Sequence, residues 1–120
     1  MEIFREFTFE ASHRLPNVPA GHKCARMHGH SYRVLVTCAG TVTETEAWVI
    51  DFGDLKDAMA PLLAQLDHRT LNDVDGLANP TAERLAQWIW DRLPLLPLSA
   101  VTVRETATSG CTYRGETVTA

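Results

Sequence analysis

Two short segments of the chain contain three of its five histidines and one of its three cysteines. His28 and His30 form an H-x-H pair, Cys24 lies four residues before it, and His13 lies upstream. Side chains at positions i and i+2 of a strand point to the same face, so His28 and His30 can converge on one metal ion if they lie on a strand. His13 adds a third imidazole if its own strand pairs with theirs. Three nitrogen ligands with one open position are typical of catalytic zinc.

The identity of the metal follows from its ligands. Imidazoles without carboxylate or thiolate favour zinc over copper, iron or nickel. The alternative is that His13, His28 and His30 are packed or surface histidines that happen to lie on strands. Clustered imidazoles need a shared metal or proton to offset the cost of burial, which favours the metal. Gly29, between two of these histidines, indicates either a close approach of backbone or a strand bulge.

Cys24 has three alternative roles: a fourth zinc ligand, a reacting thiol or an inert thiol. As a ligand it would close the metal site and make it structural. The positive charges of Lys23 and Arg26 favour its thiolate form, so we expect a reacting group that serves as general base or nucleophile. Cys38 and Cys111 are expected to be inert.

Three further residues carry groups that can transfer protons or bind ligands. Asp67 and His68 follow a predicted helix, and they are either solvated residues at a helix C-terminus or a carboxylate that orients an imidazole for proton transfer. Glu105 follows Val101 and Val103 on one face of a strand. It lies either where that strand emerges into solvent or where it can pair with a guanidine-like ring edge, as in a pterin or guanine.

Hydrophobic periodicity predicts the elements that position these residues. Alternation predicts strands over 2–15 and 28–39, and a spacing of three and four predicts helices over about 52–66 and 80–93. Further strands are expected over 99–106 and 112–118, and a short strand or strand end is expected at 48–50. Asp51 and Asn79 are the expected N-caps of the two helices. Pro80 is expected to be the first residue of the second helix, and Pro61 to kink the first helix. The order predicts an α+β fold: a four-stranded antiparallel sheet with two helices on one face.

Length and composition exclude several classes of protein. A chain of 120 residues predicts one domain over 1–120. A formal charge of −4 without runs of Lys or Arg argues against a nucleic-acid surface. Three cysteines provide no disulfide framework, no apolar run reaches the ~20 residues of a membrane span, and no signal peptide is visible. We therefore expect a cytoplasmic protein.

An ordered set of short motifs resembles the 6-pyruvoyl tetrahydropterin synthase family, which has the tunnelling fold. The set runs over nearly the whole chain and comprises residues 9–15, the unit Cys24-x3-His28-Gly29-His30, residues 49–52, residues 66–68, residues 79–83 and residues 103–106. The three residues between Cys24 and His28, and the segment 105–116, are similar to the bacterial 6-carboxy-5,6,7,8-tetrahydropterin synthase branch, which serves queuosine (7-deazaguanine) synthesis.

The resemblance implies a reaction and a role for each site residue. The substrate would be 7,8-dihydroneopterin triphosphate, and the products 6-carboxy-5,6,7,8-tetrahydropterin, acetaldehyde and triphosphate. Zinc would be bound by His13, His28 and His30, and Cys24 would act as general base. Asp67 and His68 would relay protons, and Glu105 would anchor the pterin.

The resemblance also implies an assembly and leaves rival functions open. Family members form hexamers of two trimers, with sheets joined into a barrel and active sites at subunit interfaces, so Asp67 and His68 would act on a site completed by another subunit. The nearest rival is 6-pyruvoyl tetrahydropterin synthase itself, which eliminates triphosphate without losing acetaldehyde. A rival of another class is a non-catalytic oligomer that binds zinc or pterin.

Overall fold

Two long antiparallel strands form the centre of the fold in the computed structural model, which describes residues 1–119. They are β1 (Glu2–His13) and β2 (His28–Ala39), paired along their whole length without a register shift. Alternate residues of both strands are buried, as expected where one face of a sheet is covered. The predicted strands are therefore confirmed, except that the first ends at His13 rather than at residue 15.

Three shorter strands complete the sheet, whose order is β3-β1-β2-β4-β5. β4 (Leu98–Arg104) pairs antiparallel with β2, and β5 (Gly110–Tyr113) pairs antiparallel with β4. β3 (Arg69–Thr70) runs parallel to β1 at the other edge. The predicted α+β class is confirmed, and the four predicted strands pair antiparallel as expected. The sheet has one strand more than predicted, the parallel β3, because two residues are too few to show alternation and β3 exists only through its pairing with β1.

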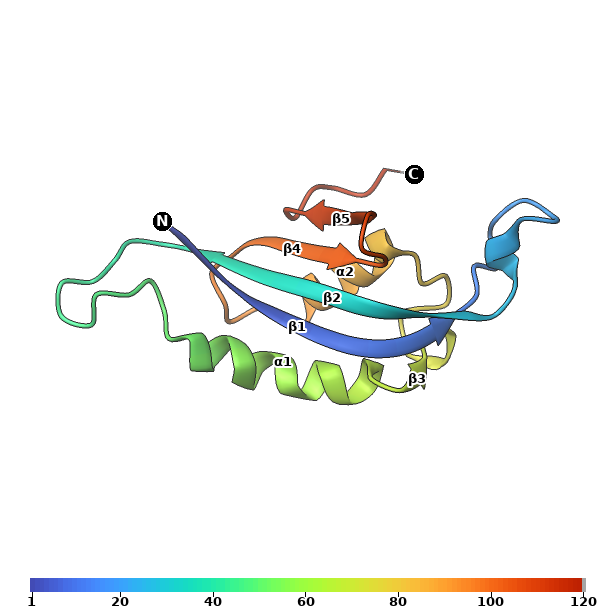
Figure 1. Ribbon diagram of the computed structural model, residues 1–120. Helices are drawn as coiled ribbons and strands as arrows, with labels where there is room; N and C mark the ends of the chain where they lie inside the picture. The colour runs from blue at the N-terminus through green and yellow to red at the C-terminus, as the bar shows by residue number, and fades with distance from the viewer. Residues whose placement is uncertain (120) are drawn as a thin grey trace.

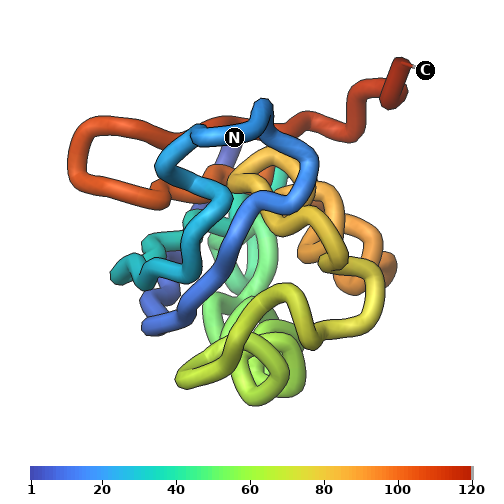
Figure 2. The backbone as a smooth tube through the Cα atoms, turned by 90° about the vertical axis from the view of Figure 1, so that its right-hand side faces the viewer, coloured from blue at the N-terminus to red at the C-terminus, as the bar shows by residue number. Residues whose placement is uncertain are grey.

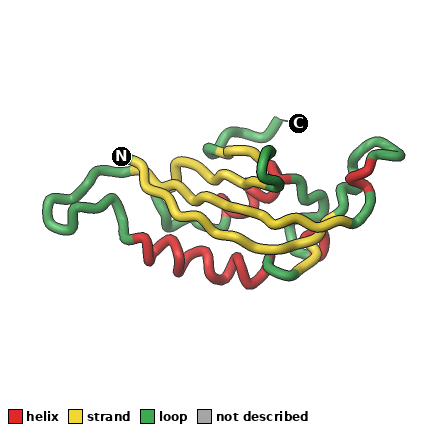
Figure 3. The backbone as a smooth tube through the Cα atoms, viewed as in Figure 1, coloured by secondary structure: helices red, strands yellow, loops and turns green. Residues whose placement is uncertain are grey.

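Both helices pack on the same face of the sheet, as predicted. α1 (Phe52–Leu66) lies along β1, and α2 (Ala82–Asp91) packs on β4 and β5. Figures 1 and 3 show α1 running alongside the long strands. Apolar side chains of both helices and of β1, β2 and β4 form one continuous core. The opposite face is uncovered, and Phe4 there is 59% exposed.

The observed element ends differ from the predicted ones in several places. Thr81, rather than Asn79, caps α2 by accepting a hydrogen bond from the Arg84 N–H, and the helix ends at Asp91. Asp51 caps α1 as predicted. The strands end at Arg104 and Tyr113, and residues 48–50 form a bend rather than a strand. α1 continues through Pro61, which lies on its exposed side, where water can bond the carbonyl that proline leaves unpaired.

The two ends of the long strands carry different loops. Residues 40–51 extend beyond one end, and residues 14–27 beyond the other, where β1 ends and β2 begins (Figure 1). The view along the strands in Figure 2 shows the 14–27 loop in blue, with α1 in green at the bottom. The 14–27 loop contains a short 3-10 helix, η1 (Lys23–Ala25), and a second, η2 (Leu71–Asp73), follows β3. Within residues 1–119, no helix is long and apolar enough to cross a bilayer.

Candidate metal centre

The register of β1 and β2 brings the three predicted histidines together. His13 pairs with His28 across the strands, and His30 lies opposite Ala11, one pair further along. All three side chains therefore point to the covered face of the sheet, at the end next to the 14–27 loop. One nitrogen from each ring lies within 4.8 Å of the others, so the three histidines form a group able to hold a metal ion.

Hydrogen bonds to carbonyl groups fix the tautomers of two of these rings. His13 Nδ1 lies 2.8 Å from the carbonyl oxygen of Pro80, and His28 Nδ1 lies 2.7 Å from that of Arg26. A carbonyl only accepts, so each Nδ1 carries the hydrogen and each Nε2 has a free lone pair. These contacts are the outer-shell hydrogen bonds that orient metal-binding histidines in proteins.

The free nitrogens of His13 and His28 face one another at close range. His13 Nε2 and His28 Nε2 lie 3.0 Å apart. His30 Nε2 is buried and makes no hydrogen bond within the described residues. Lone pairs that face each other without a proton or metal repel, and a buried nitrogen without a partner costs free energy. The donor set and its unsatisfied nitrogen therefore fit a bound metal ion.

His13 is held in its neutral form, as a metal ligand must be. The side chain is completely buried. Burial lowers the pKa of His13 below 6.5, although its hydrogen bond to Pro80 and the charge of Glu105 oppose that shift. The Tyr32 hydroxyl lies 3.2 Å from His13 Nδ1, and burial raises the pKa of Tyr32, with Glu105 adding to the shift. Both rings therefore stay uncharged at neutral pH.

Glu105 lies at the edge of this histidine group. One carboxylate oxygen, Oε1, is 3.5 Å from His13 Nε2 and 3.9 Å from His30 Nε2. Glu105 follows β4, whose buried Val101 and Val103 place it on the covered side of the sheet. The alternative of a strand simply emerging into solvent does not hold, because the side chain is only 28% exposed and points towards imidazoles.

Cys24 lies in η1 and is partly buried, but it is not part of the histidine group. The main chain around it is held in place: the Cys24 carbonyl accepts a hydrogen bond from the Leu15 N–H, and the Cys24 N–H donates to His22 Nδ1. A closed structural site with four protein ligands including this thiol is therefore not supported. The role of His22 was not predicted, since an exposed histidine in a loop carries no pattern.

Asp67 and His68 are held as a pair at the β3 edge of the sheet. Asp67 Oδ1 accepts hydrogen bonds from His68 Nδ1 and from the Glu10 N–H, both at 3.0 Å. The hydrogen bond from the Glu10 N–H is the main reason why the pKa of Asp67 is lowered. Neighbouring residues rarely bond in this way, and His68 adopts the left-handed backbone conformation, with a φ of 56°.

The single chain does not join this pair to the histidine group. The His68 side chain is 78% exposed, and within residues 1–119 neither side chain of the pair has a hydrogen bond or ion pair with His13, His28 or His30. A hollow of about 470 Å³ lies beside His68, lined by residues 10–12, 29–31 and 68–70, so His68 and His30 line the same hollow without touching. The pair thus faces open space on the surface of this chain.

Gly29 lies neither at a strand bulge nor at a close approach of backbone. It lies in an unbroken ladder opposite Ser12, so there is no bulge. A Cβ atom at this position would lie 3.5 Å from the Ala11 carbonyl oxygen, an ordinary contact, so there is no close approach either. Nothing in the structure explains a glycine here.

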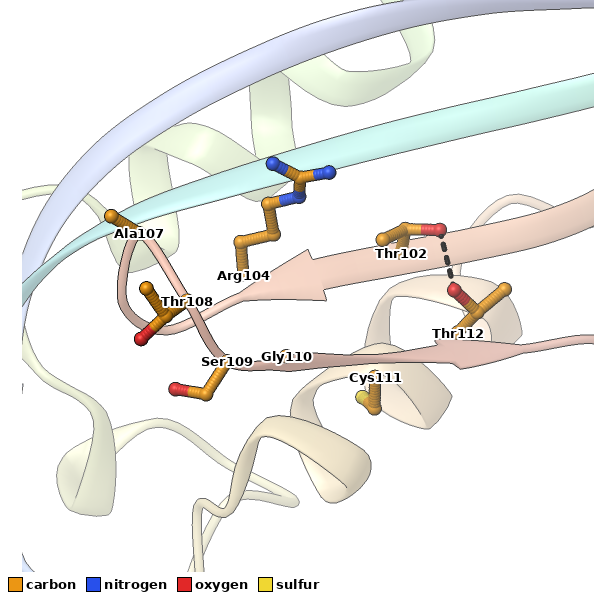
Figure 4. A pocket seen from close by; sticks show the side chains of 8 residues that line it. All are labelled: Thr102, Arg104, Ala107, Thr108, Ser109, Gly110, Cys111 and Thr112. Carbon is orange, nitrogen blue, oxygen red and sulfur yellow. Dashed lines mark hydrogen bonds between the residues drawn. The ribbon is translucent and has the colours of Figure 1, made fainter.

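A second hollow, of about 360 Å³, lies at the β4–β5 hairpin on the side away from the histidines. Figure 4 shows the Arg104 side chain pointing towards β2, and Thr108 and Ser109 pointing to the other side of the hairpin. The Thr102 and Thr112 hydroxyls bond each other at 3.0 Å. These polar groups do not converge on one point, so the geometry assigns no ligand to this hollow.

Three groups that support the centre were not predicted from sequence: the Pro80 carbonyl, the Arg26 carbonyl and the Tyr32 hydroxyl. Main-chain carbonyls have no residue signature, so no pattern could have revealed the first two. Tyr32 carried a signal, because it continues the face of His28 and His30 along β2.

Comparisons with known proteins agree with this geometry. The family model described as 6-pyruvoyl tetrahydropterin synthase matches residues 2–116. A protein of Synechocystis sp. named 6-carboxy-5,6,7,8-tetrahydropterin synthase is 42% identical over 119 residues, covering 92% of this chain and 91% of the relative. The human 6-pyruvoyl tetrahydrobiopterin synthase is 35% identical over 133 residues, covering 96% of this chain and 92% of the relative.

A solved structure shows the same fold. The 6-pyruvoyl tetrahydropterin synthase of Caenorhabditis elegans superposes with a TM-score of 0.87 at 28% identity, covering 97% of this chain and 96% of that one. The likeness therefore extends over both helices and the whole sheet.

Proposed function

This chain belongs to the 6-pyruvoyl tetrahydropterin synthase family, and from that premise we propose that it is a zinc-dependent carbon–carbon lyase. It converts 7,8-dihydroneopterin triphosphate to 6-carboxy-5,6,7,8-tetrahydropterin, acetaldehyde and triphosphate, a step in queuosine (7-deazaguanine) biosynthesis. The observation that carries the proposal is the group of three imidazole nitrogens within 4.8 Å, with the Glu105 carboxylate beside it. The name of the Synechocystis relative, 42% identical, supports the carboxy product.

Zinc is the metal that this donor set fits best, because all three ligands are neutral imidazoles. His13, His28 and His30 would hold it through their Nε2 atoms, whose lone pairs are free. When bound, zinc supplies a Lewis acid that polarises substrate oxygen atoms. The carbonyls of Pro80 and Arg26 keep two of the rings aimed at that position.

The chain's other groups bind the substrate and move its protons. We assign to Cys24 the role of general base, in which its thiolate removes a proton from the substrate side chain. The main-chain hydrogen bond from Leu15 to the Cys24 carbonyl holds η1 beside the sheet, near the start of β2. Glu105 accepts paired N–H groups from the pterin ring, which fixes the ring beside the histidines.

Asp67 and His68 act as the proton relay in this proposal. Asp67 Oδ1 orients the His68 ring by accepting a hydrogen bond from its Nδ1. That leaves His68 Nε2 directed away from Asp67, on a ring 78% exposed. Because the chain's own histidine group has no contact with the pair, we propose that the pair serves the site of another subunit.

The assembly that meets this requirement is a homohexamer, a dimer of trimers with active sites at subunit interfaces. Two features of the chain support an oligomer. The sheet ends in β3 and β5, which leave edges for pairing with another chain. One face of the sheet carries no helix, and Phe4 is exposed there.

The alternative within the family is 6-pyruvoyl tetrahydropterin synthase activity, in which triphosphate is lost but acetaldehyde is not formed. The human relative, named for the pyruvoyl reaction, is 35% identical and favours this alternative. A non-catalytic oligomer that binds zinc or pterin is the remaining alternative. It predicts that replacing Cys24 changes nothing.

The test is incubation of zinc-loaded protein with 7,8-dihydroneopterin triphosphate, with acetaldehyde and 6-carboxytetrahydropterin followed by mass spectrometry. We expect both products from the native protein, and a rate at least about 100-fold lower in Cys24→Ala with zinc retained. Cys111→Ala is the matched control, because Cys111 is also a partly buried free thiol. Triphosphate release without acetaldehyde would move the protein to the pyruvoyl reaction, and no turnover would favour the non-catalytic alternative.

A further inference from the structure

His22 lies where two turns meet in the loop between β1 and β2. This loop extends beyond the ends of both strands and contains η1 (Figure 1). The His22 N–H donates to the Pro19 carbonyl at 3.1 Å, across a turn in which Gly21 has a φ of 84°. The His22 carbonyl accepts from the Ala25 N–H at 3.1 Å, which is the first hydrogen bond of η1. Both main-chain groups of His22 are therefore engaged.

The His22 side chain adds a third bond, to the main chain of Cys24. His22 Nδ1 accepts a hydrogen bond from the Cys24 N–H at 3.1 Å. An N–H only donates, so Nδ1 carries a lone pair and the ring hydrogen is on Nε2. The bond runs from a side chain to the N–H two residues later, the pattern in which aspartate and asparagine oxygens stabilise turns. His22 is thus the N-cap of η1, with an imidazole in place of the usual oxygen acceptor.

The thiol of Cys24 depends on this main-chain support for its position. Among the hydrogen bonds of residues 1–119, none involves Cys24 Sγ. Both main-chain groups of Cys24 are bonded instead: the carbonyl accepts from the Leu15 N–H at 2.8 Å, and the N–H donates to His22. The bond from Leu15 ties η1 to the chain that leaves β1, whereas the bond to His22 orients the peptide group before Cys24. A single side-chain torsion separates the sulfur from this main chain, so the thiol moves with it.

We propose that His22 is a positioning residue for Cys24, an inference that rests on the proposed function, in which the Cys24 thiolate is the general base. His22 acts through its hydrogen bond to the Cys24 N–H and takes no part in proton transfer. The position of a reacting group matters, because a misplacement of about 1 Å can cost about 100-fold in rate.

This role makes asparagine an equivalent of histidine at position 22. Asparagine places Oδ1 the same number of bonds from the main chain as histidine places Nδ1, and asparagine is among the best N-cap residues. His22→Asn therefore keeps the acceptor and removes the imidazole, whereas His22→Ala removes both. The two variants together separate positioning from any chemistry of the ring.

The first arm of the test is hydrogen–deuterium exchange at the Cys24 amide in the zinc-loaded protein, without substrate. We expect exchange to be at least about tenfold faster in His22→Ala, because this N–H loses its acceptor, and to stay within about threefold of native in His22→Asn. Asn17→Ala is the matched control, since Asn17 is an exposed polar residue of the same loop whose side chain makes no hydrogen bond within residues 1–119. Equal exchange in the native and His22→Ala proteins would overturn the proposal.

The second arm is steady-state kinetics of the same proteins with 7,8-dihydroneopterin triphosphate. We expect kcat to be about tenfold lower in His22→Ala with KM within about twofold of native, and His22→Asn to restore kcat to within about twofold. A loss of kcat in His22→Asn equal to that in His22→Ala would assign the ring to proton transfer and overturn the proposal. A rise of KM in both variants would assign the ring to substrate binding and also overturn it.

The two arms separate failure of this inference from failure of the proposed function. Absence of turnover in the native protein would contradict the proposed function. The exchange measurement does not depend on turnover, so it would still decide whether His22 holds Cys24 in place.

Discussion

The Nε2 atoms of His13 and His28 face each other at 3.0 Å, while the Nδ1 atom of each ring donates to a main-chain carbonyl. This relationship turns two ordinary imidazoles into a pair of opposed acceptors. Without a cation the pair is repulsive, so the geometry favours a bound metal ion. The directly opposed positions of the two residues in the β1–β2 register produce it.

Removal of one ligand should abolish tight metal binding while a change at the proton relay should not. We expect His28→Ala to lose more than about 100-fold in zinc affinity, since even outer-shell changes cost 10–100-fold. His68→Ala is the control, because its ring is exposed and lies outside the histidine group. Chelator competition and the zinc-dependent rise in unfolding free energy, about 2.7 kcal/mol at 100 times the Kd, measure both. Equal affinity in the native and His28→Ala proteins would contradict the site.

Loss of the Tyr32 hydroxyl should weaken the metal site without removing a ligand. Tyr32 is completely buried, its ring stacks on Phe9, and its hydroxyl lies 3.2 Å from His13 Nδ1. We expect Tyr32→Phe to lower zinc affinity by about tenfold and the unfolding free energy by about 1 kcal/mol. Calorimetric titration with zinc and urea unfolding measure the two effects. If Tyr32→Phe binds zinc as tightly as the native protein, the hydroxyl does not orient His13.

The metal-free protein should lose stability as the pH falls below about 6.5. Burial lowers the pKa of His13 in the folded state below its ordinary value of 6.5, so the unfolded chain takes up that proton first. The contribution of His13 is therefore fully present above pH 6.5 and declines as the pH falls towards the folded pKa, at most by about 1.4 kcal/mol per pH unit. Asp67 does not contribute to this loss of stability, because its pKa is lowered and its carboxylate takes up a proton only below about pH 4.

Urea unfolding in the presence of a chelator, from pH 8 to pH 5, measures this dependence. The slope should be absent in His13→Gln, whose side chain can still donate to the Pro80 carbonyl but does not titrate. A native stability that stays constant over this range would show that His13 is not buried in its neutral form.

Two glycines should respond to substitution in opposite ways. A Cβ atom at Gly110 would clash with the Val103 carbonyl oxygen, so Gly110→Ala must displace the hairpin that carries Glu105. We expect a loss of roughly 2 kcal/mol or more in unfolding free energy. At Gly29 the nearest atom would be 3.5 Å away, so Gly29→Ala should be neutral or slightly stabilising in the strand. Thermal unfolding of both variants tests this, and equal destabilisation would contradict it.

Long elements could be predicted from sequence, and short ones could not. β2 was predicted residue for residue, and α1 over its full length, because each repeats its hydrophobic period many times. β3 escaped prediction, since its two residues pair with β1 only after the chain has folded. The N-cap of α2 was assigned to Asn79, and only the hydrogen bond to Arg84 identifies Thr81 as the cap.

The sequence by itself predicted the group of three histidines that could hold a metal ion, because an H-x-H pair and a third histidine on alternating strands can be recognised from spacing alone. Tertiary structure decided how those histidines work. It set the 3.0 Å opposition of His13 and His28, supplied the carbonyls that fix their tautomers, and brought Glu105 beside them. The physical reason is that side-chain direction follows from local periodicity, whereas hydrogen bonds to main-chain groups and contacts across ninety residues depend on how the whole sheet pairs and packs.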